Sequence, residues 1–450
     1  MRQAKLIILP GVFILLLFSV ASAGAPSGGM SDKHRAAANP EAIESELTLW
    51  AWGYTAAAIA AELPGFHEAY PGIRVRIEVK THDDMYKKLL LANASNEGGP
   101  DVAALSGYYV GQYIETNALE DLSGRIAPYR DKIVAAKWPD AMRDGRYYAM
   151  PWDSGPVALF YRRDLFAEAG LPSDPESVSR LLATWDGYLE AGRTIKERTG
   201  AFMHTMPLES TFGLTVMWEH MLAQEGMLYV DEDGAIRIDR PEALRALKQL
   251  LRMIDEGIVL DAETRSQTWN EALAEGKIAT VLEAVWMGAF LKDTAPESAG
   301  LWGVARMPAW TEGGSRAAEA GGSYLGIMRQ SDNKEAAWAF IEYMLGNSRT
   351  VNRMYRYADI FPSLKEAYRD PMYDEPEPFF GNQKTRRLFV ELANESRPVY
   401  FSHNFRAVRD IARIEMFKAI KGRITPEQAL MQMQQKMAEL TKPNRKPEEG

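Results

Sequence analysis

Residues 150–166 read MPWDSGPVALFYRRDLF and decide the fold. An aromatic ring and a carboxylate, Trp152 and Asp153, precede a Ser-Gly-Pro break, and the apolar run Val157–Tyr161 follows it. This order predicts a turn that leads into a buried strand and then into a helix beginning near Arg162. A ring for stacking beside an acceptor for hydroxyl protons suits a polyhydroxylated ligand. The alternative is a buried tryptophan beside a turn-capping aspartate, the commoner role of an isolated pair of this kind.

The N-terminus has the pattern of an export signal. Arg2 and Lys5 precede the apolar run Leu6–Val20, and Ala21-Ser22-Ala23 closes it with the small residues of a signal-peptidase site. The run is short for a membrane span, so we expect residues 1–23 to be a signal peptide that is removed. An uncleaved anchor is the alternative. Residues 24–45 hold almost no large apolar side chains, which predicts a flexible leader.

The composition restricts the class of protein. The 450 residues carry a formal net charge of −9, are 46% hydrophobic and 25% charged, and include no cysteine. Length and apolar content predict a soluble globular protein of two domains. The negative charge argues against nucleic acid or an anionic membrane surface as a partner. The lack of cysteine excludes disulfides, a thiol nucleophile, zinc–thiolate sites and a lipid-modified N-terminal cysteine. We expect a free periplasmic protein, with secretion as the second choice.

Short strands alternate with amphipathic helices along the first hundred residues. The pattern predicts strands and helices in the order 47–52, 56–70, 73–79, 83–94 and 101–105, with the first helix continuing through Pro64. This βαβαβ order implies a mostly parallel sheet covered by helices. Later helices are predicted from their first residues and glycine stops at Pro241–Glu256, Lys334–Leu345 and Thr425–Leu440, the last opening with a capping box.

Several segments occur in an order that resembles a known family. They read LTLWAWGY, FHEAYPGIRVRIE, GGPDVAALSGYYVGQYIETNALEDLS, DGRYYAMPWDSGPVALFYRRDLFAEAGL, EGKIATVLEAVWMGAF, LWGVARMPAW, GGSYLGIM and NKEAAWAFIEYML. In this order they are similar to the extracellular solute-binding proteins, family 1, of ABC importers, the maltose-binding-protein-like group that captures sugars. The resemblance covers nearly all of the chain after the signal peptide.

The resemblance implies an α/β, two-lobed periplasmic binding protein fold of type II. The lobes would be joined by crossing hinge strands near Ser154–Leu159, Val304–Pro308 and Ala358–Ser363, and would close around a ligand held in the cleft between them. The N-terminal lobe would take residues 46–154 plus 309–358, and the C-terminal lobe 155–308 plus 359–450. The family also implies a monomer that delivers its ligand to the permease subunits of an ABC transporter, with no cofactor and no catalysis.

The resemblance also places candidate ligand-binding residues at the ends of strands and in loops. We expect the cleft to be lined by Trp52, Gly53, Tyr54, Ser106, Tyr108, Trp152, Asp153, Glu209, Ser210, Phe212, Glu283, Trp286, Gly322, Ser323, Tyr324, Phe401, His403 and Asn404. This set is rich in aromatic, carboxylate and amide groups and holds no Arg or Lys, which suits a neutral sugar or oligosaccharide better than an anion. Four other tryptophans fall within regular elements and are expected in the core: Trp50, Trp218, Trp302 and Trp338.

Two alternatives remain at the level of the sequence. The same acidic and aromatic groups suit a polyamine, and carboxylates such as Asp153, Glu209 and Glu283 would also suit a secreted glycoside hydrolase. Other site patterns fail on spacing. Asp231–Gly234 resembles the opening of a calcium loop but has Ala235 at a ligand position and is predicted to be a hairpin turn. The sequence holds no complete nucleophile elbow, phosphate-binding loop or metal-binding histidine motif.

Overall fold

The computed structural model describes residues 43–211 and 213–441. It begins with the alternation that the sequence predicts: β1 (Ser45–Trp52), α1 (Gly53–Ala69), β2 (Ile73–Lys80), α2 (His82–Ser95), β3 (Val102–Ser106) and α3 (Gly107–Glu115). β1 pairs in parallel with both β2 and β3, which confirms the predicted βαβαβ unit. The structure differs at one boundary, because α1 begins directly after β1 and places Tyr54 in the first turn of a helix.

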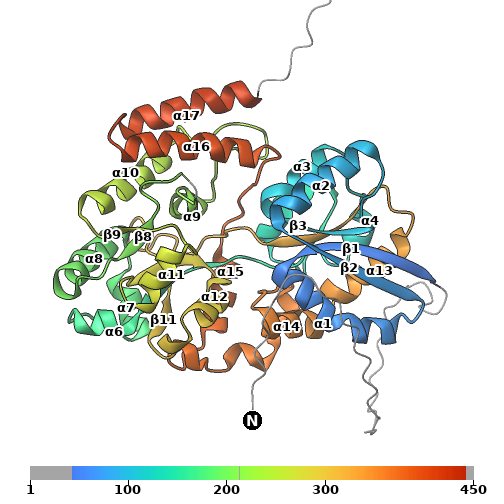
Figure 1. The fold of residues 1–450 in the computed structure, drawn as a ribbon, viewed down its shortest axis with the longest axis horizontal. Helices are drawn as coiled ribbons and strands as arrows, with labels where there is room; N and C mark the ends of the chain where they lie inside the picture. Colours follow the sequence, from blue (N-terminus) through green and yellow to red (C-terminus); the bar gives the residue numbers. More distant parts are fainter. Residues whose placement is uncertain (1–42, 212, 442–450) are drawn as a thin grey trace, which may run out of the picture. The chain divides into compact units, whose positions relative to one another are not determined.

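The strands form two principal sheets (Figure 1). The first has the order β2-β1-β3-β12-β6, with β12 antiparallel to β3 and β6. The second has the order β10-β7-β11 and is antiparallel throughout. The later strands are β4 (Met142–Arg143), β5 (Arg146–Tyr147), β6 (Met150–Pro151), β7 (Val157–Arg162), β8 (His204–Met206), β9 (Val259–Asp261), β10 (Thr280–Ala284), β11 (Trp302–Ala305) and β12 (Ser323–Ile327).

Helices follow the strands and cover the sheets. After α3 they are α4 (Ser123–Ile126), α5 (Trp138–Ala141), α6 (Arg163–Glu168), α7 (Pro175–Leu181), α8 (Trp185–Thr199), α9 (Val216–Ala223), α10 (Pro241–Asp255), α11 (Gln267–Ala274), α12 (Met287–Thr294), α13 (Lys334–Leu345), α14 (Ser348–Ala358), α15 (Thr385–Glu395), α16 (Phe405–Ile420) and α17 (Pro426–Thr441). The predicted capping box of α17 is present, since Gln428 N donates to Thr425 Oγ1 at 3.2 Å and Thr425 N donates to Gln428 Oε1 at 2.9 Å.

The apolar run Val157–Tyr161, predicted to form a buried strand, lies in β7. β7 is buried over its whole length and lies at the centre of the second sheet, between β10 and β11. All six residues of this strand are buried, so side chains on both of its faces are screened from water, which agrees with the unbroken apolar run Val157–Tyr161. The core tryptophans were also predicted correctly: Trp50, Trp218, Trp302 and Trp338 are each at most 8% exposed.

Three stretches of the described chain lie side by side next to the two sheets. Ser154 N donates to the Phe361 carbonyl at 2.9 Å, and Val157 N donates to the Ala318 carbonyl at 2.9 Å. The segment between β6 and β7 therefore runs between the segments 318–323 and 361–363. We call these three stretches the crossing segments.

The middle passage lies later in the chain than the sequence predicted. Ala309 exchanges backbone hydrogen bonds with Ala183 and Trp185, beside the second sheet's helices. Gln224 Nε2 donates to the Pro308 carbonyl at 2.6 Å. These bonds hold residues 309–315 on the side of the second sheet, so the return lies near Glu319 and not at Val304–Pro308. An expected boundary at residue 309 is therefore about ten residues early.

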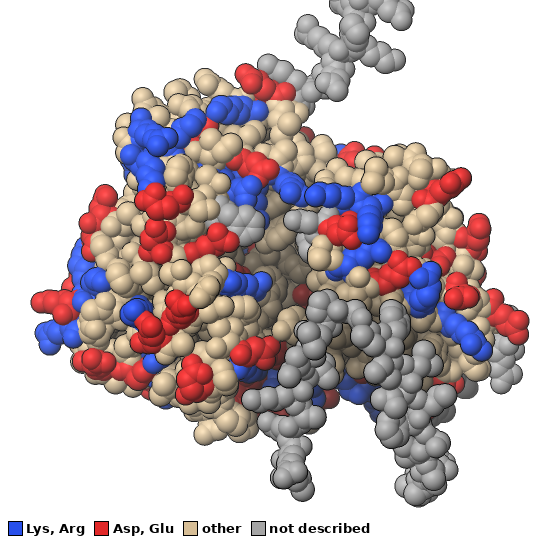
Figure 2. Space-filling model, viewed as in Figure 1, with Lys and Arg blue, Asp and Glu red and all other residues tan. Residues whose placement is uncertain are grey.

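The predicted signal peptide 1–23 and most of the predicted leader 24–45 lie outside the described residues. The leader prediction extends too far, because Ile43 packs against the core and Ser45 opens β1. No helix within residues 43–211 and 213–441 has both the length and the apolar character to cross a membrane. Figure 2 shows acidic and basic side chains interspersed over the face of the molecule that is in view, so the net negative charge does not form a single patch on that face.

Candidate functional site

A cavity of about 570 Å³ lies beside the crossing segments. We call it the aromatic cavity, because six aromatic side chains line it: Trp52, Tyr54, Tyr108, Trp286, Phe290 and Phe401. Its size falls within the range of cavities that hold small-molecule ligands. Both sheets contribute to its wall through the loops and helix starts at the ends of their strands.

The first sheet contributes the ends of its parallel strands. Trp52 ends β1, and its backbone N–H donates to Thr55 Oγ1 at 3.2 Å in the first turn of α1. Ser106 ends β3 and accepts from Tyr108 N at 3.4 Å, which caps α3. The carboxyl ends of neighbouring parallel strands meet at one edge of the sheet, which is where α/β proteins commonly bind ligands.

The crossing segments form a polar floor. Asp153 Oδ1 accepts from Ser323 N at 2.7 Å and from the Ser323 hydroxyl. Glu319 accepts from Ser154 Oγ at 2.6 Å and from Gly155 N at 2.7 Å. Burial raises the pKa of both carboxyls. These carboxylates therefore bind the first crossing segment to the second and have part of their hydrogen-bonding capacity already in use.

A lysine that the sequence analysis did not single out lies under this floor. Lys137 is fully buried, its Nζ donates to the Gly321 carbonyl at 2.7 Å, and it lies 3.6 Å from Glu319 Oε1. Asp140, one helical turn later, accepts from the Tyr324 hydroxyl at 2.6 Å and from Phe401 N at 3.2 Å. Burial raises the pKa of Asp140 to about 7. A single buried cation thus faces three buried carboxyls, those of Asp140, Asp153 and Glu319.

The second sheet's side contributes a charged pair. Arg409 on α16 binds both carboxylate oxygens of Glu219 on α9 at 2.8 Å. The Tyr229 hydroxyl donates to the same carboxylate at 2.5 Å. Arg409 also lies over the ring of Tyr108, 5.3 Å from its centroid. The predicted set of ligand-binding residues holds no Arg or Lys, whereas Arg409 and Arg265 both line the cavity. Arg409 faces the cavity because it lies one helical turn beyond Phe405, a relationship that only the packing of α16 reveals.

His220 and Glu283 offer hydrogen-bonding groups next to this pair. His220 Nε2 lies 3.8 Å from Glu283 Oε1, and His220 Nδ1 is buried with no hydrogen-bond partner. Burial lowers the pKa of His220 below its ordinary value of 6.5, so the imidazole is neutral at pH 7. Glu283 accepts a hydrogen bond from Ala284 N at 2.8 Å. A neutral imidazole and a carboxylate with spare acceptor capacity suit hydroxyl groups.

Trp286 presents its ring against a glycine of the first crossing segment. It immediately precedes α12 and is half-buried. A Cβ added at Gly155 would lie 2.7 Å from the indole, so only glycine allows this approach. One region of the ring is therefore fixed against backbone while the side chain also lines the aromatic cavity.

Ten of the predicted residues line the aromatic cavity: Trp52, Tyr54, Ser106, Tyr108, Asp153, Glu283, Trp286, Gly322, Ser323 and Phe401. Trp152 and Tyr324 were also predicted to contact the ligand, but the structure does not place them in this cavity. Trp152 is 1% exposed and Tyr324 is fully buried. The reason is alternation along extended chain: the side chains of Asp153 and Ser323 face the cavity, so the side chains of Trp152 and Tyr324, one position away, face the core.

The other predicted residues lie elsewhere. Glu209 is exposed and pairs with Lys421 at 2.5 Å, and neither Gly53 nor Ser210 lines the aromatic cavity. Phe212 is outside the described residues. His403 and Asn404 line a second cavity instead. The sequence analysis also missed several lining residues, including Thr55, Glu219, His220, Glu263, Arg265, Phe290, Glu319, Asp359 and Arg409. The adjacent Glu219 and His220 were the one visible signal, since the sequence shows them as a charged pair within an apolar segment.

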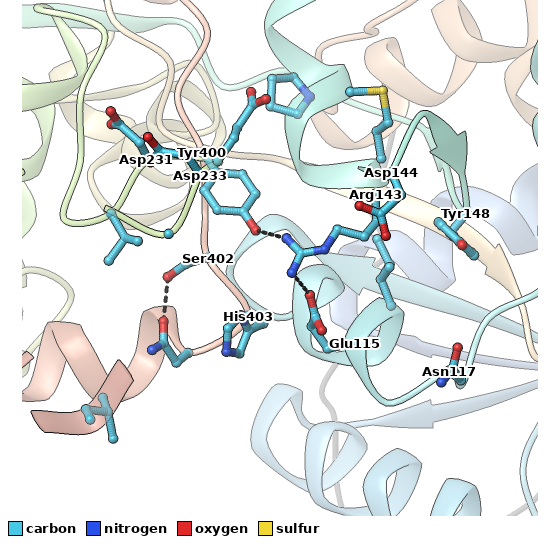
Figure 3. A pocket seen from close by; sticks show the side chains of 18 residues that line it. Glu115, Asn117, Arg143, Asp144, Tyr148, Asp231, Asp233, Tyr400, Ser402 and His403 are labelled. Carbon is cyan, nitrogen blue, oxygen red and sulfur yellow. Dashed lines mark hydrogen bonds and ion pairs between the residues drawn. The ribbon is translucent and has the colours of Figure 1, made fainter. Parts of the chain in front are cut away.

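The second cavity, of about 850 Å³, has a different chemistry (Figure 3). We call it the polar cavity. Arg143 spans part of it, donating to the Tyr400 hydroxyl at 3.2 Å and pairing with Glu115. Asp231 and Asp233 lie on its wall, in the hairpin that the sequence predicts. Because it offers few aromatic faces and its arginine is already paired, we take the smaller aromatic cavity as the candidate ligand site.

The site residues also bear on metals and catalysis. Within residues 43–211 and 213–441, no group of three or more His, Asp or Glu side chains is arranged to hold a metal ion. Of the three carboxylates that a hydrolase would use, Glu209 is exposed outside the cavity and Asp153 is engaged by Ser323. Asp153 and Glu283 both line the aromatic cavity.

Comparisons with known proteins agree with this geometry. Residues 51–349 match the sequence family described as bacterial extracellular solute-binding protein. The chain is 26% identical over 404 residues to an arabinooligosaccharide-binding protein of Halalkalibacterium halodurans, covering 87% of this chain and 88% of the relative. It is 28% identical over 362 residues to a lactose-binding protein of Rhizobium radiobacter, covering 78% and 82%.

A solved structure shows the same fold. An ABC transporter associated binding protein from B. animalis subsp. lactis, in complex with beta-1,6-galactobiose, superimposes with a TM-score of 0.71 at 25% identity. The match covers 89% of this chain and 98% of that one. The α/β architecture with two sheets is thus the type II periplasmic binding protein fold that the sequence resemblance implied.

Proposed function

The chain belongs to the bacterial extracellular solute-binding proteins, and from this premise we propose that it captures a neutral sugar or oligosaccharide in the aromatic cavity and delivers it to the permease of an ABC importer. The relatives named above are described as binding arabinooligosaccharides, lactose and beta-1,6-galactobiose. All three are neutral saccharides.

One observation supports the proposal: the same cavity is lined by aromatic faces and by polar groups that can form further hydrogen bonds. Trp286 and Trp52 offer rings to the C–H faces of a sugar. Glu283 and His220 offer acceptors and donors to its hydroxyls. Arg409 is held by both oxygens of Glu219, which leaves it less suited to an anionic ligand than a free arginine.

The proposal includes closure of two lobes about the crossing segments. The five-stranded sheet would belong to one lobe and the three-stranded sheet to the other, with the middle crossing near Glu319. This is supported by the way the chain passes between the sheets in three adjacent stretches, where a small rotation would move one sheet relative to the other. Ligand contacts to both sides exist only in the closed state, so the ligand would favour closure.

We further propose that the protein is exported, cut after Ala23 and free in the periplasm without a lipid anchor. It would act as a monomer, require no cofactor and leave its ligand chemically unchanged. Sequencing the N-terminus of the mature protein tests the first part, with Gly24 expected as the first residue. Intact Met1 in the membrane fraction would contradict it.

A thermal-shift screen tests the ligand class, because a ligand that binds only the folded state raises the melting temperature. The probes are arabino-oligosaccharides, galacto-oligosaccharides, lactose, malto-oligosaccharides and spermidine. We expect at least one saccharide to stabilise the protein and to be recovered intact. Stabilisation by spermidine alone would favour the polyamine alternative, and the release of new reducing ends would favour a hydrolase.

A further inference from the structure

The residues that line the aromatic cavity range from exposed to buried. Tyr54 is 65% exposed, and Thr264 and Arg265 are exposed as well. By contrast, Glu219 is 7% exposed and His220 is 4% exposed. These exposures distinguish a rim, formed by the first group, from an inner end, formed by the second. A ligand thus meets aromatic and solvated groups at the rim and buried polar groups inside.

The inner end is closed by interlocked aromatic rings. Tyr108 lies parallel to Phe405, with centroids 5.3 Å apart and an interplanar angle of 4°, and meets Phe401 edge-on at 5.1 Å. The Tyr108 hydroxyl donates to the Ala320 carbonyl at 3.3 Å. The Tyr108 ring is thus held by a stacked ring, an edge-on ring and the hydrogen bond of its hydroxyl, which makes it a packed part of this wall.

The segment Tyr400–Ser402 forms the other part of the wall and separates the two cavities. Phe401 lines the aromatic cavity, whereas Tyr400 and Ser402 line the polar cavity. Among the described residues, the two cavities have no lining residue in common. The main chain is held at this place by the Phe401 N–H, which donates to Asp140 Oδ1 at 3.2 Å.

From this geometry we infer that the aromatic cavity binds a saccharide by one end of its chain, with the terminal unit against the inner wall and the rest leaving at the Tyr54 rim. The inference rests on the proposed function and narrows it, because it distinguishes recognition of a chain end from recognition of an internal stretch. His220 and Glu283 are the buried groups placed to bind the hydroxyls of the terminal unit.

The chemistry of the inner end supports a terminal unit there. A chain that continued through the wall would need an apolar or solvated exit, but this end holds the Glu219–Arg409 pair and a buried imidazole nitrogen without a partner. Buried polar groups favour a ligand that brings hydroxyls to them. At about 570 Å³ the cavity also has room for only a few sugar rings.

Blocked oligosaccharides test the inference directly. The probes are arabinotetraose, galactotetraose and maltotetraose, each free, each with 2-aminobenzamide on the reducing end, and each with a benzyl ether on the non-reducing terminal unit. Binding is measured by calorimetric titration of the full mature chain. For the series that binds in free form, we expect one blocked form to bind within about threefold of the free tetrasaccharide and the other to lose at least a hundredfold. Equal binding of both blocked forms, or loss of both, would overturn end recognition.

A variant pair tests the wall itself. Phe401→Ala should remove part of the partition and restore binding of the rejected blocked form by at least tenfold. His403→Ala, which changes a residue that lines the polar cavity and not the aromatic cavity, should leave the rejection intact. If Phe401→Ala does not fold, as judged by its melting curve, Tyr108→Leu serves the same purpose. Continued rejection by a folded wall variant would contradict the role of this wall. Should none of the free tetrasaccharides bind, the sugar proposal fails instead, and the two failures are thereby distinguished.

Discussion

Replacing Trp286 and Trp152 one at a time separates ligand binding from folding, because the structure gives the two indoles opposite roles. Trp286 lines the aromatic cavity, whereas Trp152 is 1% exposed and lies in the core. We expect Trp286→Ala to weaken saccharide binding with a modest loss of stability. Trp152→Ala should lower the melting temperature and leave the affinity of the folded fraction unchanged.

The magnitudes follow from the surfaces involved. A fully buried aromatic side chain covers about 150–250 Å², so one face covers about 80–100 Å². At about 25 cal/mol per Å² the loss of one stacking face is worth about 2 kcal/mol, or about thirtyfold in Kd. Truncating a buried tryptophan to alanine costs about 3–5 kcal/mol of stability, since it also leaves a cavity.

The assay combines calorimetric titration with thermal melting on both variants, using the saccharide that gives the largest thermal shift with the parent. Trp286→Phe serves as the matched control, because it keeps an apolar face and should retain most of the affinity. The reasoning is refuted if Trp286→Ala binds like the parent, or if folded Trp152→Ala loses affinity as much as Trp286→Ala does.

Three further substitutions test other parts of the site. Gly155→Ala should displace the Trp286 ring, which a Cβ would meet at 2.7 Å, and weaken binding about tenfold while the protein stays folded; unchanged affinity would show that the ring position does not matter. Glu283→Gln should weaken binding by about 1–2 kcal/mol because an amide is a poorer acceptor than a carboxylate, and Glu209→Gln, on the exposed surface, should have no effect in the same titration. Asp140→Asn tests pH dependence: with a folded pKa of about 7 against an ordinary 3.8, Asp140 holds a proton in the folded state that the unfolded chain releases, so its contribution to stability falls as pH rises from about 4 to 7. The melting temperature of the variant relative to the parent should therefore rise over that interval, and a constant difference would contradict the pKa shift.

The parent's own pH profile is a weaker test of Asp140 than this difference. Burial lowers the pKa of His204 to about 4, so the unfolded chain binds a proton that the folded protein does not. That histidine makes stability rise with pH between about 4 and 6.5, opposite in sign to Asp140. Subtracting the variant's melting temperature from the parent's cancels the histidine contribution and leaves that of the carboxyl and the groups facing it, which are Lys137 and Tyr324.

Hydrophobic periodicity, together with capping and helix-breaking residues, predicts the helices and strands well where neighbouring residues determine them. The helix Lys334–Leu345 has the bounds that the sequence predicts, and the capping box of α17 forms as expected. The middle crossing segment was misplaced because residues 309–315 are held by hydrogen bonds to Ala183 and Gln224. Those partners are more than eighty residues away in the sequence, so no local sequence pattern predicts these hydrogen bonds.

The site shows the same division between local and distant causes. Strand ends were predicted, and with them Trp52, Ser106 and Tyr108. The choice between neighbouring residues was not, since a shift by one position in extended chain exchanges the cavity for the core. Trp152 and Asp153 were both predicted to line the cavity, and only Asp153 does. Arg409 was missed because its position depends on how α16 packs against α3 and α9, which involves segments some two to three hundred residues apart.

The polar floor explains why the most conspicuous carboxylate of the sequence is a poor choice for the ligand's principal acceptor. Asp153 accepts a hydrogen bond from Ser323, and Glu319 accepts hydrogen bonds from Ser154 and Gly155. Through these bonds the two carboxyl groups join the crossing segments to one another. Burial raises the pKa of both, which further favours a structural role over an open anionic one. Glu283, on β10, accepts a hydrogen bond from Ala284 N and keeps spare acceptor capacity. Under the proposed function, the floor fixed by internal hydrogen bonds would serve as the hinge, and the wall with spare acceptor capacity would determine specificity for the saccharide.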